Sequence, residues 1–293
     1  MASPWIDLHS HSTASDGTLT PTQVVELAVR NNLSALALTD HDTIAGVAEA
    51  AGAAKKAGVD FIPGIEISAE FPAPGTLHIL GYGVSSDSPV LHEMTAKLIE
   101  GRNNRNPRMV AKLNELGVAV TMEEWEAESK GDVLGRPQLA AILVRKGYVS
   151  SIKDAFNKYL AQGAPAYFDK ERLAPAKAFE MIRRSGGLPV LAHPAQLRTE
   201  NDAQLDRIVK DLLDLGLAGI EVFHSDHDDA WIAKSTALAK RYSLLQTGGS
   251  DFHGSNKKDI DLGTARGKRI PRELYDKLAA AIAAQSQPSK ARV

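Results

Sequence analysis

Histidine and carboxylate side chains follow the ends of several short apolar segments in this sequence. His9 and His11 come directly after the first segment, and Asp16 lies five residues further on. Because side chains alternate along extended backbone, a His-X-His triplet directs both imidazoles to one side, where they can bind one metal ion. Asp251 and His253 have the same spacing after the last segment. The pattern predicts metal ligation by paired side chains.

Most of the other histidines occupy equivalent positions. Six of the nine, His9, His11, His41, His193, His224 and His253, follow an apolar segment, while His78 begins one and Glu66 lies near the end of another. Since the carboxyl ends of parallel strands meet on one face of an α/β fold, we expect these side chains to form one site. Imidazole and carboxylate ligands suit manganese, iron or zinc, and there are too many for one ion. We predict two or three divalent ions, Mn²⁺ first with Fe²⁺ or Zn²⁺ as alternatives, and Glu66 as the bridging carboxylate.

The apolar segments have the length of strands and alternate with stretches of helical periodicity. We expect strands at residues 5–8, 35–39, 61–67, 77–82, 188–192, 219–223 and 244–247, and helices at 21–31, 43–57, 176–185, 203–215, 230–242 and 272–285. This alternation is typical of parallel strands joined by crossover helices. Residues 99–167 interrupt it with several helices separated by glycine-containing turns. The sequence predicts an α/β barrel-like domain of residues 1–98 and 168–293, with a helical insertion at 99–167 that contributes to substrate binding.

The composition narrows the classes of function. Lys and Arg number 34 against 36 Asp and Glu, and the net charge of −2 argues against a protein that coats long nucleic acid or an acidic membrane. The absence of cysteine excludes a thiolate metal site, a disulfide and a cysteine nucleophile. We see no signal peptide or membrane-spanning run, and expect a soluble, cytoplasmic protein. Neither a Gly-X-Ser-X-Gly elbow nor a glycine-rich phosphate loop is present.

In order and spacing, the motifs resemble those of the polymerase-and-histidinol-phosphatase (PHP) family. The resemblance is carried by His9-Ser10-His11, Thr39-Asp40-His41, Glu66, His78, Ala192-His193-Pro194 and Gly249-Ser250-Asp251-Phe252-His253. It implies a distorted seven-stranded (β/α)7 barrel with a nine-ligand metal centre. The implied ligands are His9, His11, Glu66 and Asp251 for one ion, Glu66, His78 and His193 for a second, and Asp16, His41 and His253 for a third.

The insertion resembles that of one PHP subgroup, in Gly135-Arg136-Pro137 and in residues 159–167. That subgroup hydrolyses nucleoside 3′,5′-bisphosphates, such as adenosine 3′,5′-bisphosphate, to the 5′-monophosphate. The resemblance therefore implies a metal-dependent phosphatase that removes the 3′-phosphate from a small nucleotide. This chain has Gln138 where the subgroup pattern has histidine after Gly-Arg-Pro.

Basic residues of the insertion suit a substrate with two phosphates. Arg102, Arg105, Arg108 and Lys112 form a local basic cluster. Guanidinium groups bind phosphate in a fork, so one or two of them can hold the phosphate that is not cleaved. The predicted substrate-binding residues are Arg102, Arg136, Lys170 and His224.

The predicted catalytic residues are Glu66, Asp251 and His224. His224 lies outside the nine-ligand set and is free to stabilise charge on the phosphoryl oxygens or to protonate the leaving alcohol. The expected reaction is an in-line attack of activated water on the 3′-phosphorus, without a covalent enzyme intermediate.

Three alternatives stay open. A 5′–3′ exonuclease on short RNA would use the same metal site, with the insertion holding the next nucleotide. A histidinol-phosphate phosphatase suits the arginine cluster less well, and a non-catalytic PHP module is disfavoured by the complete ligand set. We expect a monomer or small homo-oligomer whose partner is a small nucleotide or short RNA.

Overall fold

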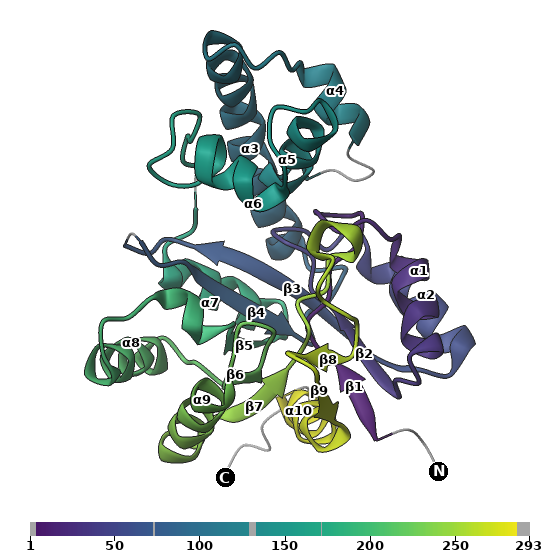
Figure 1. Cartoon of the computed structure of the whole chain (residues 1–293). Coiled ribbons are helices and arrows are strands. Elements are labelled where there is room, and N and C mark those ends of the chain that lie inside the picture. The colour runs from purple at the N-terminus through teal and green to yellow at the C-terminus, as the bar shows by residue number, and fades with distance from the viewer. Residues whose placement is uncertain (1–3, 73, 129–132, 171, 286–293) are drawn as a thin grey trace.

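A computed structural model describes residues 4–72, 74–128, 133–170 and 172–285 (Figure 1). Its strands form a single sheet in the order β7-β6-β5-β4-β3-β2-β1-β9-β8. Their bounds are β1 (Trp5–Asp7), β2 (Ala35–Leu38), β3 (Asp60–Ala69), β4 (Leu77–Tyr82), β5 (Leu188–Leu191), β6 (Gly219–Phe223), β7 (Leu245–Gly248), β8 (Thr264–Ala265) and β9 (Lys268–Pro271). The sheet curves into a nearly closed, barrel-like wall, which confirms the predicted α/β barrel fold.

All seven expected strands are present, but the prediction that they are all parallel is wrong. β1, β2 and β3 are parallel, as are β5, β6 and β7, whereas β4 runs antiparallel to both β3 and β5. Only residues 70–76 join β3 to β4. A parallel crossover needs a dozen or more residues, so this short connection enforces a reversal of direction.

The sequence analysis missed β8 and β9, which form a hairpin and extend the sheet beyond β1. Both are short, and the residues of β9, Lys-Arg-Ile-Pro, contain no apolar run. Ile270 is the one residue of β9 that is fully buried, and it pairs with Ile6 of β1. This pairing covers the edge of β1, the strand that leads into the first predicted metal-binding motif.

Helices cover the outside of the sheet. They are α1 (Pro21–Arg30), α2 (Val47–Ala57), α7 (Pro175–Arg184), α8 (Asp202–Asp214), α9 (Asp229–Arg241) and α10 (Arg272–Gln285). Thr20 begins α1 with a reciprocal capping box to Gln23. α2 begins at Val47, four residues later than expected, and ends at Gly58, whose φ of +69° suits glycine. α1 and α2 lie side by side, with α1 in contact with β2 and α2 in contact with β3, and α10 packs against β7, β1 and β9 (Figure 1).

Residues between β4 and α7 form a helical unit above the sheet (Figure 1). Its elements are α3 (Pro89–Glu115), α4 (Met122–Glu128), α5 (Arg136–Arg145), α6 (Ile152–Ala155) and a π-helical turn (Phe156–Leu160). Helix α3 runs through the predicted boundary at residue 99. Leu91 and Leu98 belong to the core between the sheet and the helices that cover it. Met109 and Leu113 belong to a separate core around Trp125. The division at 99–167 stays a prediction, since one continuous helix joins the two cores.

Among the described residues, no helix combines the length and the apolar character needed to cross a membrane. Helix α3 is the longest at 27 residues, but it carries several arginines and lysines.

We expect Trp125→Ala to destabilise the protein by about 3–5 kcal/mol, because Trp125 is fully buried and a cavity would replace the indole. Its Nε1–H also donates to the Gly135 carbonyl at 3.2 Å. Urea unfolding followed by fluorescence and circular dichroism measures the change. Leu116→Ala, at a side chain that is 41% exposed, is the control and should alter stability by less than about 0.5 kcal/mol. Equal effects of the two substitutions would contradict the assignment of this core.

Candidate metal centre and active site

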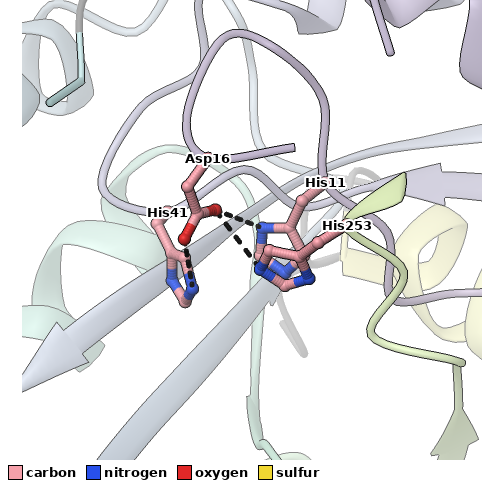
Figure 2. Close-up of side chains that lie close together, drawn as sticks. All are labelled: His11, Asp16, His41 and His253. Carbon is pink, nitrogen blue, oxygen red and sulfur yellow. Dashed lines mark ion pairs between the residues drawn. The ribbon is translucent and has the colours of Figure 1, made fainter. Parts of the chain in front are cut away.

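Four side chains from three separate chain segments converge around Asp16 (Figure 2). Asp16 Oδ1 lies 3.3 Å from His253 Nε2 and 3.9 Å from His11 Nδ1, and its Oδ2 lies 4.0 Å from His41 Nε2. His11 follows β1, His41 follows β2 and His253 follows β7. The carboxyl ends of these strands therefore bring together residues that are more than 200 positions apart in the sequence.

A second group lies beside the first and includes the two-residue motif after β1. Glu66 Oε2 is 3.3 Å from Nε2 of His9 and 3.3 Å from Nε2 of His11. Asp251 Oδ1 closes the group, at 3.2 Å from His11 Nε2 and 3.6 Å from His9 Nε2. Both imidazoles do face the same side, as the His-X-His spacing predicts. All four side chains are buried.

Glu66 also reaches a third set of imidazoles. Its Oε1 lies 2.8 Å from His78 Nδ1 and 2.9 Å from His193 Nε2, and its Oε2 lies 3.0 Å from His41 Nδ1. His78 enters at the start of β4, and it reaches this end of the sheet because β4 is antiparallel to β3. The structure thus brings all nine predicted ligands into one cluster with Glu66 at its centre; their roles as ligands stay a prediction.

Unpartnered buried atoms indicate what this cluster holds. Within the described ranges, hydrogen-bond partners are lacking for His9 Nε2, both ring nitrogens of His11, His41 Nδ1, His193 Nδ1 and Glu66 Oε2. Each such buried group costs about 1–3 kcal/mol when it has no partner. Converging nitrogen and oxygen donors without sulfur fit divalent ions such as Mn²⁺, Fe²⁺ or Zn²⁺. The residues present therefore fit a metal centre of more than one ion.

The carboxylates of the cluster are held in their charged form. Burial by itself raises the pKa of Glu66, but the imidazoles of His41 and His78 outweigh burial and hold that pKa well below its ordinary value. Asp16 has a similarly lowered pKa, because His253 and His41 outweigh its burial. Ionised oxygens are the form that ligates a metal.

Left-handed backbone occurs at two residues of the cluster and at its neighbour Asp42. His193, Asp42 and Asp251 have φ values of +22°, +56° and +59°. Left-handed backbone of this kind costs non-glycine residues about 1–3 kcal/mol and is retained mainly at functional sites. Gly249 meets a different constraint, since a Cβ there would lie 2.2 Å from the Cβ of His9. Only glycine lets the β7 end approach the first ligand this closely.

His224, predicted as a catalytic and substrate-binding residue, is buried beside the cluster. Its Nδ1 accepts the N–H of Asp226 at 3.0 Å, so the neutral ring carries its proton on Nε2. That Nε2 lies 3.3 Å from Asp251 Oδ2. His224 is therefore oriented as a proton donor toward the rim of the cluster.

The sequence analysis assigned no role to four buried carboxylates around the cluster: Asp7, Asp40, Asp42 and Glu221. Asp40 accepts the Ser12 N–H at 2.7 Å and the Ser15 hydroxyl at 2.6 Å, and so holds the loop that carries Asp16. The sequence offered one indication of a role for Asp7 and Asp40, because each lies close to a predicted ligand, Asp7 to His9 and Asp40 to His41. Nothing in the sequence distinguished Glu221 from an ordinary strand residue.

A cavity of about 240 Å³ opens from the cluster toward the insertion. Its lining includes three predicted ligands, Asp16, His41 and His78. It also includes five cations: Arg102, Arg105, Arg136, Lys170 and Arg172. The predicted basic cluster on α3 is therefore divided. Arg102 and Arg105 are buried and line the cavity, whereas Arg108 stacks on Phe168 and Lys112 pairs with Glu115.

Few carboxylates offset these cations. Arg102 and Lys170 both donate to one oxygen of Asp42, and Arg172 pairs with Asp169 at 2.7 Å. Arg105 donates only to the neutral side chain of Asn106 among the bonds found in the described residues. Burial together with the neighbouring Arg102 lowers the pKa of Arg105 to about 9. The cations that line the cavity are therefore suited to an anion.

Gln138, which replaces the histidine of the subgroup pattern, has a structural role. Its Oε1 accepts the Gly135 N–H at 2.5 Å and its Nε2 donates to the Ser15 carbonyl at 2.8 Å. It thus joins the start of α5 to the loop that carries Asp16, and fixes the insertion against the metal cluster.

Manganese is expected to stabilise the folded protein, because ions that occupy the clustered ligands bind only the native state. At a Mn²⁺ concentration 100 times Kd, the free energy of unfolding should rise by about 2.7 kcal/mol per site. Differential scanning calorimetry with and without a chelator measures the effect. The gain should shrink in Glu66→Gln, and unchanged unfolding of the wild type in Mn²⁺ would contradict the metal centre.

Comparison with known proteins agrees with this geometry. The PHP domain model matches residues 7–222. A 3′,5′-nucleoside bisphosphate phosphatase of Chromobacterium violaceum is 35% identical over 88% of this chain and 90% of its own length. A 5′–3′ exoribonuclease of Escherichia coli, Rnm, is 34% identical over 84% of each chain. A phosphoribosyl 1,2-cyclic phosphate 1,2-diphosphodiesterase of Eggerthella lenta is 36% identical over 85% of this chain and 94% of its own.

Solved structures extend the similarity to the whole fold. A C. violaceum protein described as an amidohydrolase with bound sulfate and no metal has a TM-score of 0.86, 33% identity, and coverage of 94% of this chain and 96% of its own. A putative metal-dependent phosphoesterase of Bifidobacterium adolescentis has a TM-score of 0.84 and 29% identity, over 94% and 95% of the two chains. From the family match and these relatives, the chain belongs to the PHP domain family.

Proposed function

We propose that this protein removes the 3′-phosphate from nucleoside 3′,5′-bisphosphates, such as adenosine 3′,5′-bisphosphate, to give the 5′-monophosphate. As a PHP protein with clustered His, Asp and Glu side chains, it is a metal-dependent phosphoesterase. The observation that supports the finer assignment is the cavity, whose lining combines three predicted metal ligands with five cations. A substrate with two phosphates matches this lining, because one phosphate can bind at the ligands and the other at the cations.

The relatives support this substrate class without selecting one substrate. The bisphosphate phosphatase, the exoribonuclease and the cyclic-phosphate diphosphodiesterase are between 34% and 36% identical to this chain. Cleavage of a phosphoester beside a second phosphate is the chemistry favoured by a cavity lined by both predicted metal ligands and cations.

The nine predicted ligands would hold the divalent ions, and these would supply Lewis-acid chemistry for activating water and neutralising charge on the cleaved phosphate. Arg102 and Lys170 hold the 5′-phosphate and so fix the 3′-phosphorus next to the cluster. His224 donates its Nε2 proton to a phosphoryl oxygen or to the leaving 3′-oxygen. Glu66 and Asp251 stay ionised and orient the imidazoles around the reacting phosphate.

Phosphate release from adenosine 3′,5′-bisphosphate, dinucleotides and histidinol phosphate tests the proposal. We expect the bisphosphate to give the highest kcat/KM and adenosine 5′-monophosphate as product. His9→Ala and Asp251→Ala, both in excess Mn²⁺, should lower kcat by at least about 100-fold. Intact turnover in either variant would contradict the site.

A 5′–3′ exonuclease on short RNA is the second candidate, favoured by the similarity to the E. coli exoribonuclease. The same cations would hold the 5′-phosphate of the RNA. A higher kcat/KM for dinucleotides, with mononucleotide products, would replace the first proposal by this one. Hydrolysis of histidinol phosphate alone would indicate a histidinol-phosphate phosphatase.

The affinity for the bisphosphate should depend on pH through Lys170. Burial and the neighbouring Arg102 lower the pKa of Lys170 to about 7. Lys170 therefore loses its charge as pH rises above about 7, where the phosphates of the substrate are already dianionic. We expect KM to increase between pH 7 and 9 in the wild type and to stay flatter in Lys170→Arg, whose guanidinium remains charged. Parallel KM profiles of the two proteins would exclude Lys170 from phosphate binding.

A further inference from the structure

Glu221 is a buried carboxylate behind the metal cluster, outside the nine predicted ligands. It lies in the middle of β6 and its exposed fraction is 0%. Its Oε1 lies 3.0 Å from His9 Nδ1, and its Oε2 accepts the backbone N–H of His193 at 2.8 Å. One side chain thus contacts two predicted ligands that come from β1 and from β5.

The contact with His9 selects a tautomer. A carboxylate offers only acceptors, so the ring nitrogen that faces it, Nδ1, carries the proton. The lone pair is then on Nε2, which lies 3.3 Å from Glu66 Oε2 and has no hydrogen-bond partner in the described residues. Glu221 therefore presents the metal-binding nitrogen of His9 to the cluster, in the way that a carboxylate orients a ligating histidine.

The contact with His193 holds a strained backbone. His193 has a φ of +22°, which is unfavourable for a residue with a Cβ. The bond from its N–H to Glu221 fixes this conformation, and with it the ring whose Nε2 lies 2.9 Å from Glu66 Oε1. Without this bond, we expect the backbone at His193 to adopt a less strained conformation, which would move its ring away from Glu66.

We infer that Glu221 is a positioning residue that orients His9 and His193, one ligand from each of two metal positions. The inference rests on the proposed metal centre. The third position, formed by Asp16, His41 and His253, does not use Glu221, since no hydrogen bond or ion pair found within the described ranges joins them. Loss of Glu221 should therefore weaken two metal sites and spare the third.

Glu221 can also be considered as a ligand itself, because ligand atoms of His9, Glu221 and His224 lie within 4.8 Å of one another. For His9 this requires metal on Nδ1 as well as Nε2, and hence loss of the proton that Nδ1 gives to Glu221. His224 Nδ1 is already engaged by Asp226 N–H. The hydrogen-bonded arrangement favours orientation over ligation.

Metal titration of the full-length protein tests this inference. Glu221→Gln keeps the size of the side chain but leaves one acceptor for two donors, and Asp206→Asn is the matched control. Asp206 accepts from Tyr242 and Arg241 on the outside of the sheet. Mn²⁺ binding to metal-free protein is measured by calorimetry with a competing chelator. Metal content is measured by elemental analysis, and folding by circular dichroism.

We expect Glu221→Gln to lower Mn²⁺ affinity by about 10–100-fold at two sites, with the third site unchanged. Asp206→Asn should bind like the wild type. Equal affinity of Glu221→Gln and wild type at every site would overturn the inference, as would an equal loss of affinity at all sites. It would also be overturned if Glu221→Gln bound one ion fewer than the wild type, because Glu221 would then be a ligand itself. Failure of the wild type to bind Mn²⁺ would instead refute the proposed function.

The tautomer of His9 gives a second readout, in protein loaded with diamagnetic Zn²⁺. Long-range ¹H–¹⁵N NMR spectra of this protein should place the His9 proton on Nδ1 in the wild type. In Glu221→Asp, whose shorter side chain cannot reach both donors, His9 should lose this fixed tautomer or His193 its protected amide. A wild-type His9 with its proton on Nε2 would overturn the inference even if the Gln variant failed to fold.

Discussion

A carboxylate removed from water needs compensating charge and hydrogen-bond donors, and Glu66 has both only because five imidazoles surround it. Its two oxygens lie within 3.3 Å of ring nitrogens of His9, His11, His41, His78 and His193. These histidines come from the ends of four different strands and their following loops. The barrel-like sheet therefore brings these five histidines together around one buried carboxylate.

The reversal of β4 is essential to this arrangement. If β4 were parallel to β3, its first residues would lie at the opposite end of the sheet, and His78 would be far from Glu66. The antiparallel direction pairs Ser68 with His78, and so places the His78 ring 2.8 Å from Glu66. Hydrogen bonds from behind the cluster, such as those of Asp40 to the Asp16 loop and of Glu221 to His9, then restrict the ligands to one geometry.

The insertion adds charge of the opposite sign. Asp42 directly follows the predicted ligand His41, and it accepts from Arg102 on the outgoing helix α3 and from Lys170 on the returning segment. One carboxylate beside the metal cluster thus holds both connections of the helical unit. This link places Arg102 and Lys170 close to the predicted metal ligands, and both groups line the same cavity.

The sequence by itself determined the strand order along the chain, the barrel-like fold and the set of candidate ligands. These depend on local patterns: apolar segments of strand length and side chains placed where parallel strands end. The direction of β4 was also available from the sequence, because the short connection before β4 leaves no room for a parallel crossover. The sequence did not determine the hairpin β8–β9 or the contacts of Glu221. A short edge hairpin has no apolar pattern, and Glu221 contacts His9 only because the fold places it opposite a residue 212 positions away. Likewise, four basic residues of α3 look equivalent in sequence, and only the packing of the helix decides that Arg102 and Arg105 face the cavity while Arg108 and Lys112 do not.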